Sequence, residues 1–145
     1  MTAKEYLQQI YVCNRRMKRI QETREQLRID MYSIGSPMGN MSSDRVQTST
    51  SGDKFGRMIA RVDKLERDLV KEHGRMLALK DKIIRQIEAM DNEQQRSVLY
   101  HRYVLCWKWS AIAEDMMLDE RWIYRIHGQA LKAFEKQFKL TSERQ

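Results

Sequence analysis

The sequence contains few of the residues that interrupt regular secondary structure or tie loops together. Its 145 residues include one proline, six glycines and two cysteines. Because proline breaks helices and central strands, a chain with a single proline can form long uninterrupted elements. Cys13 and Cys106 are two isolated cysteines far apart in sequence, which neither frame a disulfide scaffold nor match the spacing of a zinc site. We therefore expect two buried thiols.

Long apolar runs are also missing. No apolar stretch approaches the ~18 residues that suggest a membrane span, and the opening MTAKEYLQQI lacks the apolar centre of a signal peptide. We expect a cytoplasmic protein that does not bind membranes.

Signatures of catalysis are equally scarce. His73, His101 and His127 are scattered, without carboxylates or cysteines at ligand spacing. The sequence has no glycine-rich phosphate loop and no G-x-S-x-G motif. It therefore predicts a protein that is not an enzyme and has no metal site or cofactor.

Two long segments carry apolar residues at alternating spacings of four and three, which is typical of helices packed along a seam. The first seam is Tyr6, Ile10, Cys13, Met17, Ile20, Leu27 and Met31, interrupted by Arg24. The second is Met58, Val62, Leu65, Leu69, Met76, Leu79, Ile83 and Met90, with Glu72 and Gln86 in two of its positions. We predict an all-α protein in which residues 1–90 form a long antiparallel helical hairpin.

Residues 33–54 differ in composition from both seams. They include Pro37, three glycines and six serines, a mixture that cannot bury enough apolar surface to order itself. We predict a flexible loop between the two helices. An alternative is a loop that binds a partner through Met38, Met41 and Val46.

Residues 95–134 show the periodicity of three short helices. Val98, Leu99 and Leu105 supply the apolar stripe of the first. In the second, Trp109, Ile112, Ala113 and Met116 share one face, and in the third the buried face is Ile123, Ile126, Ala130, Leu131 and Phe134. Asp119 is placed to cap the third helix with its side-chain oxygen. A short helix, a tight turn and a longer helix are typical of a helix-turn-helix, whose last helix enters the major groove of DNA.

Three runs carry a family resemblance: WSAIAEDM at 109–116, DERWIYRI at 119–126 and the pair AL at 130–131. They resemble region 4 of sigma-70 factors, which has an E-I-A helix, a capped recognition helix and a closing A-L pair. With the long helices in front, the chain is similar to small phage-encoded transcription regulators of the ArpU and RinA type. The resemblance covers about 40 residues well and implies a DNA-binding domain over residues 91–140, followed by a polar tail at 141–145. It also implies activation of late phage genes at a promoter, together with the RNA polymerase of the host.

The side chains off the buried stripe of the third helix are the candidates for DNA contact. They are Glu120, Arg121, Tyr124, Arg125 and Gln129. The resemblance places base and phosphate contacts at the first four. Their chemistry agrees, because arginine can donate two hydrogen bonds to guanine and tyrosine can pack against a thymine methyl. Trp122 departs from the family pattern, which often has a basic residue there, and it could instead pack onto the second helix.

Two further features of the third helix bear on DNA binding. Lys132 lies on one side with Lys136 and Lys139, where the three either contact phosphates or are simply solvated. Gly128 is unusual inside a helix. We interpret it as a position of close packing within the protein, with close approach of the DNA backbone as the alternative.

The net charge of +7 suits a polyanionic partner, but it is not concentrated near the helix-turn-helix. Residues 91–145 carry nine Lys or Arg against eight Asp or Glu. Few phosphates can therefore be neutralised at once, which favours binding shared with polymerase or with a second copy of the chain. One alternative is a coiled-coil protein that docks on RNA polymerase without reading DNA. Another is an accessory protein for DNA packaging or recombination.

Overall fold

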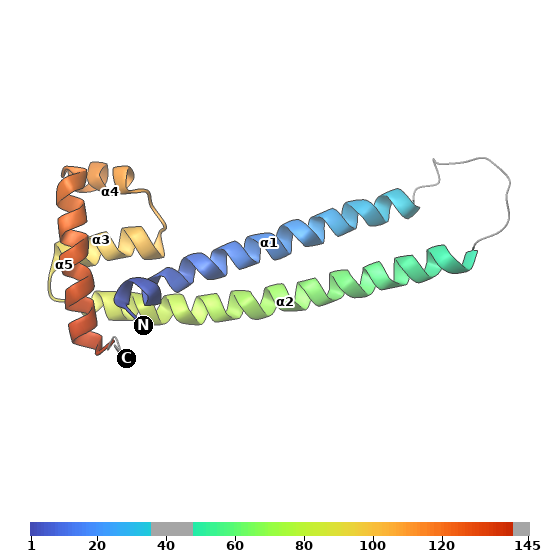
Figure 1. Cartoon of the computed structure of the whole chain (residues 1–145), viewed down its shortest axis with the longest axis horizontal. Helices are drawn as coiled ribbons and strands as arrows, with labels where there is room; N and C mark the ends of the chain where they lie inside the picture. Colours follow the sequence, from blue (N-terminus) through green and yellow to red (C-terminus); the bar gives the residue numbers. More distant parts are fainter. Residues whose placement is uncertain (36–47, 141–145) are drawn as a thin grey trace. The chain divides into compact units, whose positions relative to one another are not determined.

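The computed structural model describes residues 1–35 and 48–140, and for 34, 35 and 48–51 it describes the backbone alone. This part of the chain is all helical and has no strand, which confirms the predicted all-α class. The elements are α1 (Ala3–Gly35), α2 (Thr48–Glu88), α3 (Glu93–Leu99), the π-helical turn η1 (Tyr100–Val104), α4 (Trp109–Met116) and α5 (Glu120–Phe138) (Figure 1).

The first two helices are longer than the sequence predicted. A loop was expected over residues 33–54, but α1 continues to Gly35 and α2 begins at Thr48. Once a long helix exists, adding a residue costs little, so polar residues and glycine can extend its ends. Near the end of α1, the Ser33 hydroxyl donates to the Asp30 carbonyl at 2.7 Å. The rest of the predicted loop, residues 36–47, and the predicted polar tail at 141–145 lie outside the described residues.

The chain divides into two compact units. Unit 1 comprises Met1–Asn14 and Arg75–Gln145, and unit 2 comprises Arg15–Gly74. This division differs from the expected boundary at residue 90, because the start of α1 and the end of α2 belong with the C-terminal helices. The physical reason lies in the core of unit 1, to which α1 and α2 both contribute.

The larger hydrophobic cluster of unit 1 joins the start of α1, the end of α2, α3, η1 and the C-terminal part of α5. Its members include Tyr6, Leu7, Ile10, Ile83, Ile87, Leu99, Tyr103, Ala130 and Phe134. Polar bonds at its edge tie distant parts of the sequence together. The Tyr6 hydroxyl donates to Gln86 Oε1 at 2.8 Å, and the Ala3 backbone N–H donates to Glu135 Oε1 at 3.0 Å. Gln86 therefore fills its position in the apolar seam by bonding with tyrosine.

The smaller cluster of unit 1 holds α3, α4 and α5 together through Val98, Ile112, Ala113, Ile123 and Ile126. The expected face of α4 and the expected stripe of α5 are both confirmed: Leu131, Trp109 and Met116 are half-buried, and the other predicted residues are buried.

One prediction for the first short helix is wrong, because Leu105 is 43% exposed. The helix passes into the π-helical turn η1, whose wider turn shifts the buried face away from Leu105. Tyr103 and Val104 are buried in its place.

Unit 2 pairs a segment of α1 with a segment of α2. The ion pairs Arg16–Glu72 at 3.3 Å and Arg28–Glu66 at 2.7 Å show that the two segments run in opposite directions. Among its described residues only Val62 and Glu72 are buried, and the remaining seam residues are half-buried. Unit 2 is therefore a thin two-helix layer.

Candidate nucleic-acid interface

A tight turn joins α4 to α5. Met117 follows α4 with a left-handed backbone (φ 53°), and the Leu118 N–H donates to the Ala113 carbonyl at 3.0 Å. This bonding is typical of a helix that ends in a Schellman motif, where glycine is the usual residue at the left-handed position. Only residues 117–119 separate the two helices, so α5 starts at a fixed place relative to α4.

Asp119 occupies the N-cap position of α5, but the predicted side-chain cap is wrong. Its backbone is extended and its carbonyl accepts from the N–H groups of Trp122 and Ile123 at 3.0 and 3.1 Å, while its carboxylate makes no capping bond. By contrast, Asn92 caps α3 through Oδ1, which accepts from the Gln95 N–H at 3.0 Å. The carboxylate of Asp119 thus remains at the surface beside the start of α5.

All six side chains predicted to contact DNA are exposed on α5. They are Glu120, Arg121, Tyr124, Arg125, Gln129 and Lys132. The buried residues of the same helix occupy the opposite side, so the helix has one anchored and one open face. These six residues form an elongated surface along one helix, which can contact a large partner.

Trp122 does not have the packing that the sequence suggested. It is 54% exposed and is not among the side chains packed on the smaller cluster. The Arg125 guanidinium lies over its ring, 5.3 Å from the ring centroid. This cation–π contact restricts the orientation of Arg125 and leaves its outer side accessible.

Beneath the open face lies a network that the sequence analysis missed. The Trp109 ring lies 5.0 Å from that of Tyr124 and 4.7 Å from that of His127. The Arg102 guanidinium lies 4.3 Å from the Trp109 ring centroid, and the Tyr103 hydroxyl is 2.8 Å from His127 Nε2. The network connects η1 and α4 to α5 and supports Tyr124 from below.

Two groups of this network have strongly shifted pKa values. Burial, with smaller effects from Lys4 and Arg102, lowers the pKa of His127 to about 4. Burial also raises the pKa of Tyr103 to about 12. At neutral pH both groups are therefore uncharged. The only sequence signal for this network was the mixture of aromatic and basic residues at 100–103, which does not indicate which side chains meet.

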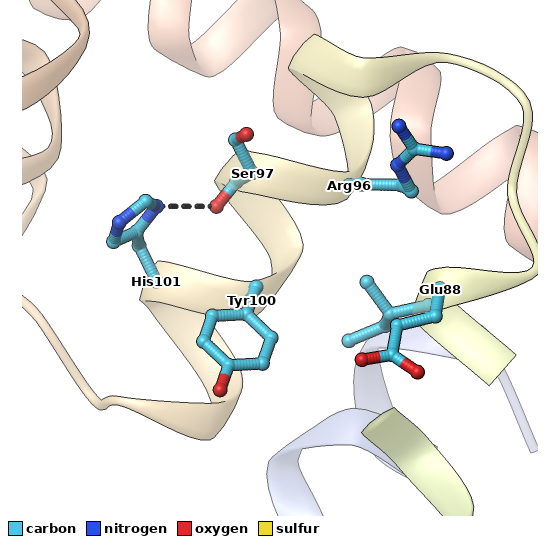
Figure 2. A pocket seen from close by; sticks show the side chains of 6 residues that line it. Glu88, Arg96, Ser97, Tyr100 and His101 are labelled. Atoms are coloured by element: carbon cyan, nitrogen blue, oxygen red, sulfur yellow. Dashed lines mark hydrogen bonds between the residues drawn. The ribbon is translucent and has the colours of Figure 1, made fainter. Parts of the chain in front are cut away.

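A small pocket lies where α2 and α3 approach each other in unit 1. Its volume is about 180 Å³ and its lining comprises Ile87, Glu88, Arg96, Ser97, Tyr100 and His101 (Figure 2). His101 Nδ1 is 2.7 Å from the Ser97 carbonyl, and the Arg96 guanidinium donates to the Met90 carbonyl at 2.9 Å. The Arg96 bond therefore ties α3 to the segment that follows α2, whereas the His101 contact lies within the continuous α3–η1 segment.

The two cysteines are half-buried, so the expectation of buried thiols is wrong. Cys106 follows η1 with a left-handed backbone (φ 58°), and this irregular turn leaves its thiol partly accessible. Asn14 Nδ2 lies 3.7 Å from the Cys106 sulfur. Partial burial raises the pKa of the Cys106 thiol, which keeps it protonated at neutral pH.

Gly128 lies within α5, and the expected packing reason for it is wrong. A Cβ atom built at this position would meet no atom within 4 Å. A side chain at this position would therefore point into open space, as it would at Gly52, Gly56 and Gly74, although glycine costs a helix about 1 kcal/mol relative to alanine.

Comparisons with known proteins gave no match among family models, curated proteins or solved structures. In the described part of the chain, no helix is long and apolar enough to cross a membrane. The same residues contain no group of three or more His, Cys, Asp or Glu able to hold a metal ion.

Proposed function

We propose that this protein is a sequence-specific DNA-binding regulator of transcription that reads double-stranded DNA with α5. In this proposal α4, the turn at 117–119 and α5 act as a helix-turn-helix similar to sigma region 4, carried by a hairpin of α1 and α2. The observation that carries it is the two-sided construction of α5. Buried Ile123, Ile126 and Phe134 hold one face, while the six polar candidates are all exposed on the remainder.

The positions of the candidates suit base reading. Arg121 and Arg125 are four residues apart and therefore lie on the same surface of the helix. Their guanidinium groups can each donate two hydrogen bonds to a guanine from a planar, rigid fork. Tyr124 is 49% exposed while its ring leans on Trp109. Because contact with Trp109 already restricts the Tyr124 side chain, its exposed ring edge can contact DNA with little further loss of conformational entropy.

The charge balance supports a shared mode of binding. Residues 120–140 carry five Lys or Arg against two Asp or Glu, a modest basic surface. One such surface neutralises few phosphates and binds weakly by itself. We propose that contact with host RNA polymerase, or pairing of two copies through α1 and α2, supplies the remaining affinity. Two linked DNA contacts bind far more tightly than one.

The first experiment is a selection of bound duplexes from a random-sequence pool, followed by fluorescence anisotropy on the enriched duplex and on a scrambled one at two salt concentrations. We expect the wild type to prefer the enriched duplex. Arg121→Ala and Arg125→Ala should each lose about 1–3 kcal/mol of that preference. Arg61→Ala is the matched control, because it removes one exposed positive charge from α2. The proposal is wrong if the pool yields no preferred sequence, or if the control reduces the preference as much as Arg125→Ala does.

A second candidate function, docking onto a protein such as RNA polymerase without reading DNA, is favoured by one observation. Met117 is 91% exposed and Trp122 is 54% exposed, close together in sequence at the start of α5. Exposed Trp and Met are typical of protein-binding surfaces. Met117→Ser and Trp122→Ala distinguish the two functions. Under the DNA-reading proposal Met117→Ser leaves the preference for the enriched duplex unchanged. Under the docking alternative both variants abolish polymerase capture, and Arg125→Ala has no effect on it.

A further inference from the structure

We infer that Gly128 is the point at which the sugar–phosphate backbone of bound DNA comes closest to α5. This inference rests on the proposed function and adds a steric requirement to it. The starting observation is a cost without an internal benefit. Glycine weakens a helix interior, yet no described part of the chain occupies the space where the Gly128 side chain would be, and the same is true of Gly52, Gly56 and Gly74 in α2.

The residues next to Gly128 on the surface of α5 indicate which kind of partner approaches it. Residues three and four positions away on a helix are its surface neighbours, and for Gly128 these include Tyr124, Arg125 and Lys132. Arg121 lies two turns earlier on the same side. Arg125 and Lys132, both exposed, therefore flank the gap on either side along the helix. Gly128 itself is half-exposed, and two cations around a half-exposed stretch of backbone favour an anionic partner over an apolar one.

The position of Gly128 along α5 suits contact with the DNA backbone and not with the bases. In a helix-turn-helix the first residues of the second helix reach the base edges. Gly128 lies two turns after Arg121, where the helix leaves the bases and passes the wall of the groove. Without a Cβ, the peptide backbone can approach a sugar or phosphate closely, and Lys132 can then bond to a phosphate beside it.

Gly74 offers a matched control. It also lies inside a long helix, α2, is exposed, and would carry a Cβ into open space. The four variants Gly128→Ala, Gly128→Leu, Gly74→Ala and Gly74→Leu therefore change helix propensity in the same way at both sites. All four should raise the thermal midpoint, because alanine and leucine stabilise helices relative to glycine.

The test is the affinity of the full chain for the enriched duplex, measured beside the thermal midpoint. Gly128→Leu should bind about tenfold or more weakly, comparable to the loss of one base contact. Gly128→Ala should bind more weakly by a smaller factor, and both Gly74 variants should bind like the wild type. The decisive result is that at Gly128 the folded state gains stability while DNA affinity falls with side-chain size.

Three outcomes overturn the inference. Unchanged affinity in Gly128→Leu shows that nothing approaches the gap. Equal losses in Gly128→Ala and Gly128→Leu show that flexibility of α5, and not space, is required. A wild type without preference for any duplex overturns the proposed function as well, and this outcome is recognised before any glycine variant is measured.

Discussion

Units 1 and 2 both contain segments of α1 and α2, but more of the side chains on these helices are buried in unit 1 than in unit 2. In unit 1 the start of α1 and the end of α2 meet α5, and Leu7, Ile10, Ile83 and Phe134 are completely buried. In the described part of unit 2 the two helices have each other alone, and only Val62 and Glu72 are buried. In unit 1, packing of α5 against α1 and α2 thus buries apolar side chains that would otherwise be half-exposed.

The difference indicates where structural precision is needed. The open face of α5 is held by buried residues on its other side and by the network of Trp109, Arg102 and His127. A surface that reads bases requires such fixed side chains. Unit 2 has charged residues within its seam, and only two of its described residues are buried. Under the proposed function, unit 2 does not need the same precision, because it does not contact bases.

The largest expected effect comes from the core of unit 1. Phe134→Ala removes a fully buried ring and should lower the free energy of unfolding by about 3–5 kcal/mol. Leu69→Ala, at a half-buried position of unit 2, should cost about 1 kcal/mol. Hydrogen exchange resolved by peptide, together with chemical denaturation, measures both. Equal losses at the two sites would contradict the contrast between the units.

The next effect is a dependence on pH that belongs to unit 1. His127 has a pKa of about 4 in the folded chain, below its ordinary value of 6.5. The unfolded chain therefore takes up the proton first, so stability is lost as pH falls from about 6.5 towards 4. Burial, and more weakly Lys4 and Arg102, disfavour the protonated ring, and the Tyr103 hydroxyl is its hydrogen-bond partner.

Denaturation at pH 7 and pH 5 measures this effect. His127→Gln should reduce the difference in stability between the two pH values, because the titrating group is gone. His73→Gln, at an exposed position of α2 in unit 2, is the control and should leave the difference as it is in the wild type. If His127→Gln behaves like His73→Gln, the histidine does not contribute to the acid sensitivity of unit 1.

A third prediction addresses the polar residue buried in unit 2. The Glu72 carboxylate occupies a seam position, where it is paired with a half-exposed Arg16 at 3.3 Å. Arg16 is half-exposed and stays solvated when its partner is removed, so Glu72→Leu exchanges a desolvated carboxylate for apolar packing and should raise the free energy of unfolding by about 1 kcal/mol. Lower thermal stability in Glu72→Leu would show that the ion pair contributes more to unit 2 than apolar contact can.

Residue patterns predicted much of this structure. The alternating spacing identified the two long helices, and the apolar stripes identified the anchored faces of α4 and α5. Both signals are local, because one face of a helix can be read from a few turns of sequence. Five of the six exposed candidates on α5 followed as the complement of its stripe, and Lys132 was named because it shares one side of the helix with Lys136 and Lys139.

Contacts between distant segments could not be read in the same way. The π-helical turn places Leu105 outside the core, and no residue pattern at 100–105 predicts this wider turn. The start of α1 packs against α5, and Arg102 and His127 both contact Trp109. Both sets of contacts depend on how the helices pack in three dimensions, which the local sequence pattern does not specify. The gap at Gly128 likewise appears only when its surroundings are known.

The smallest expected effect concerns the turn before α5. Met117 has a left-handed backbone and a side chain that is 91% exposed, so it has strain without compensating burial. Met117→Gly should raise the free energy of unfolding by about 0.5–1 kcal/mol, since glycine adopts this conformation freely. Thermal denaturation measures the change. A loss of stability would show that the methionine side chain supports the turn.

The most direct test of the central claim, that unit 1 reads DNA through α5, is site-specific photo-crosslinking to the enriched duplex. A photoreactive phenylalanine derivative is placed either at Tyr124 on α5 or at Tyr32 on α1, two exposed tyrosines of the two units. We predict a strong crosslink from position 124, suppressed by excess unlabelled enriched duplex but not by scrambled duplex, and none from position 32. A crosslink from position 32 alone, or from neither position while the duplex is bound, would contradict the account.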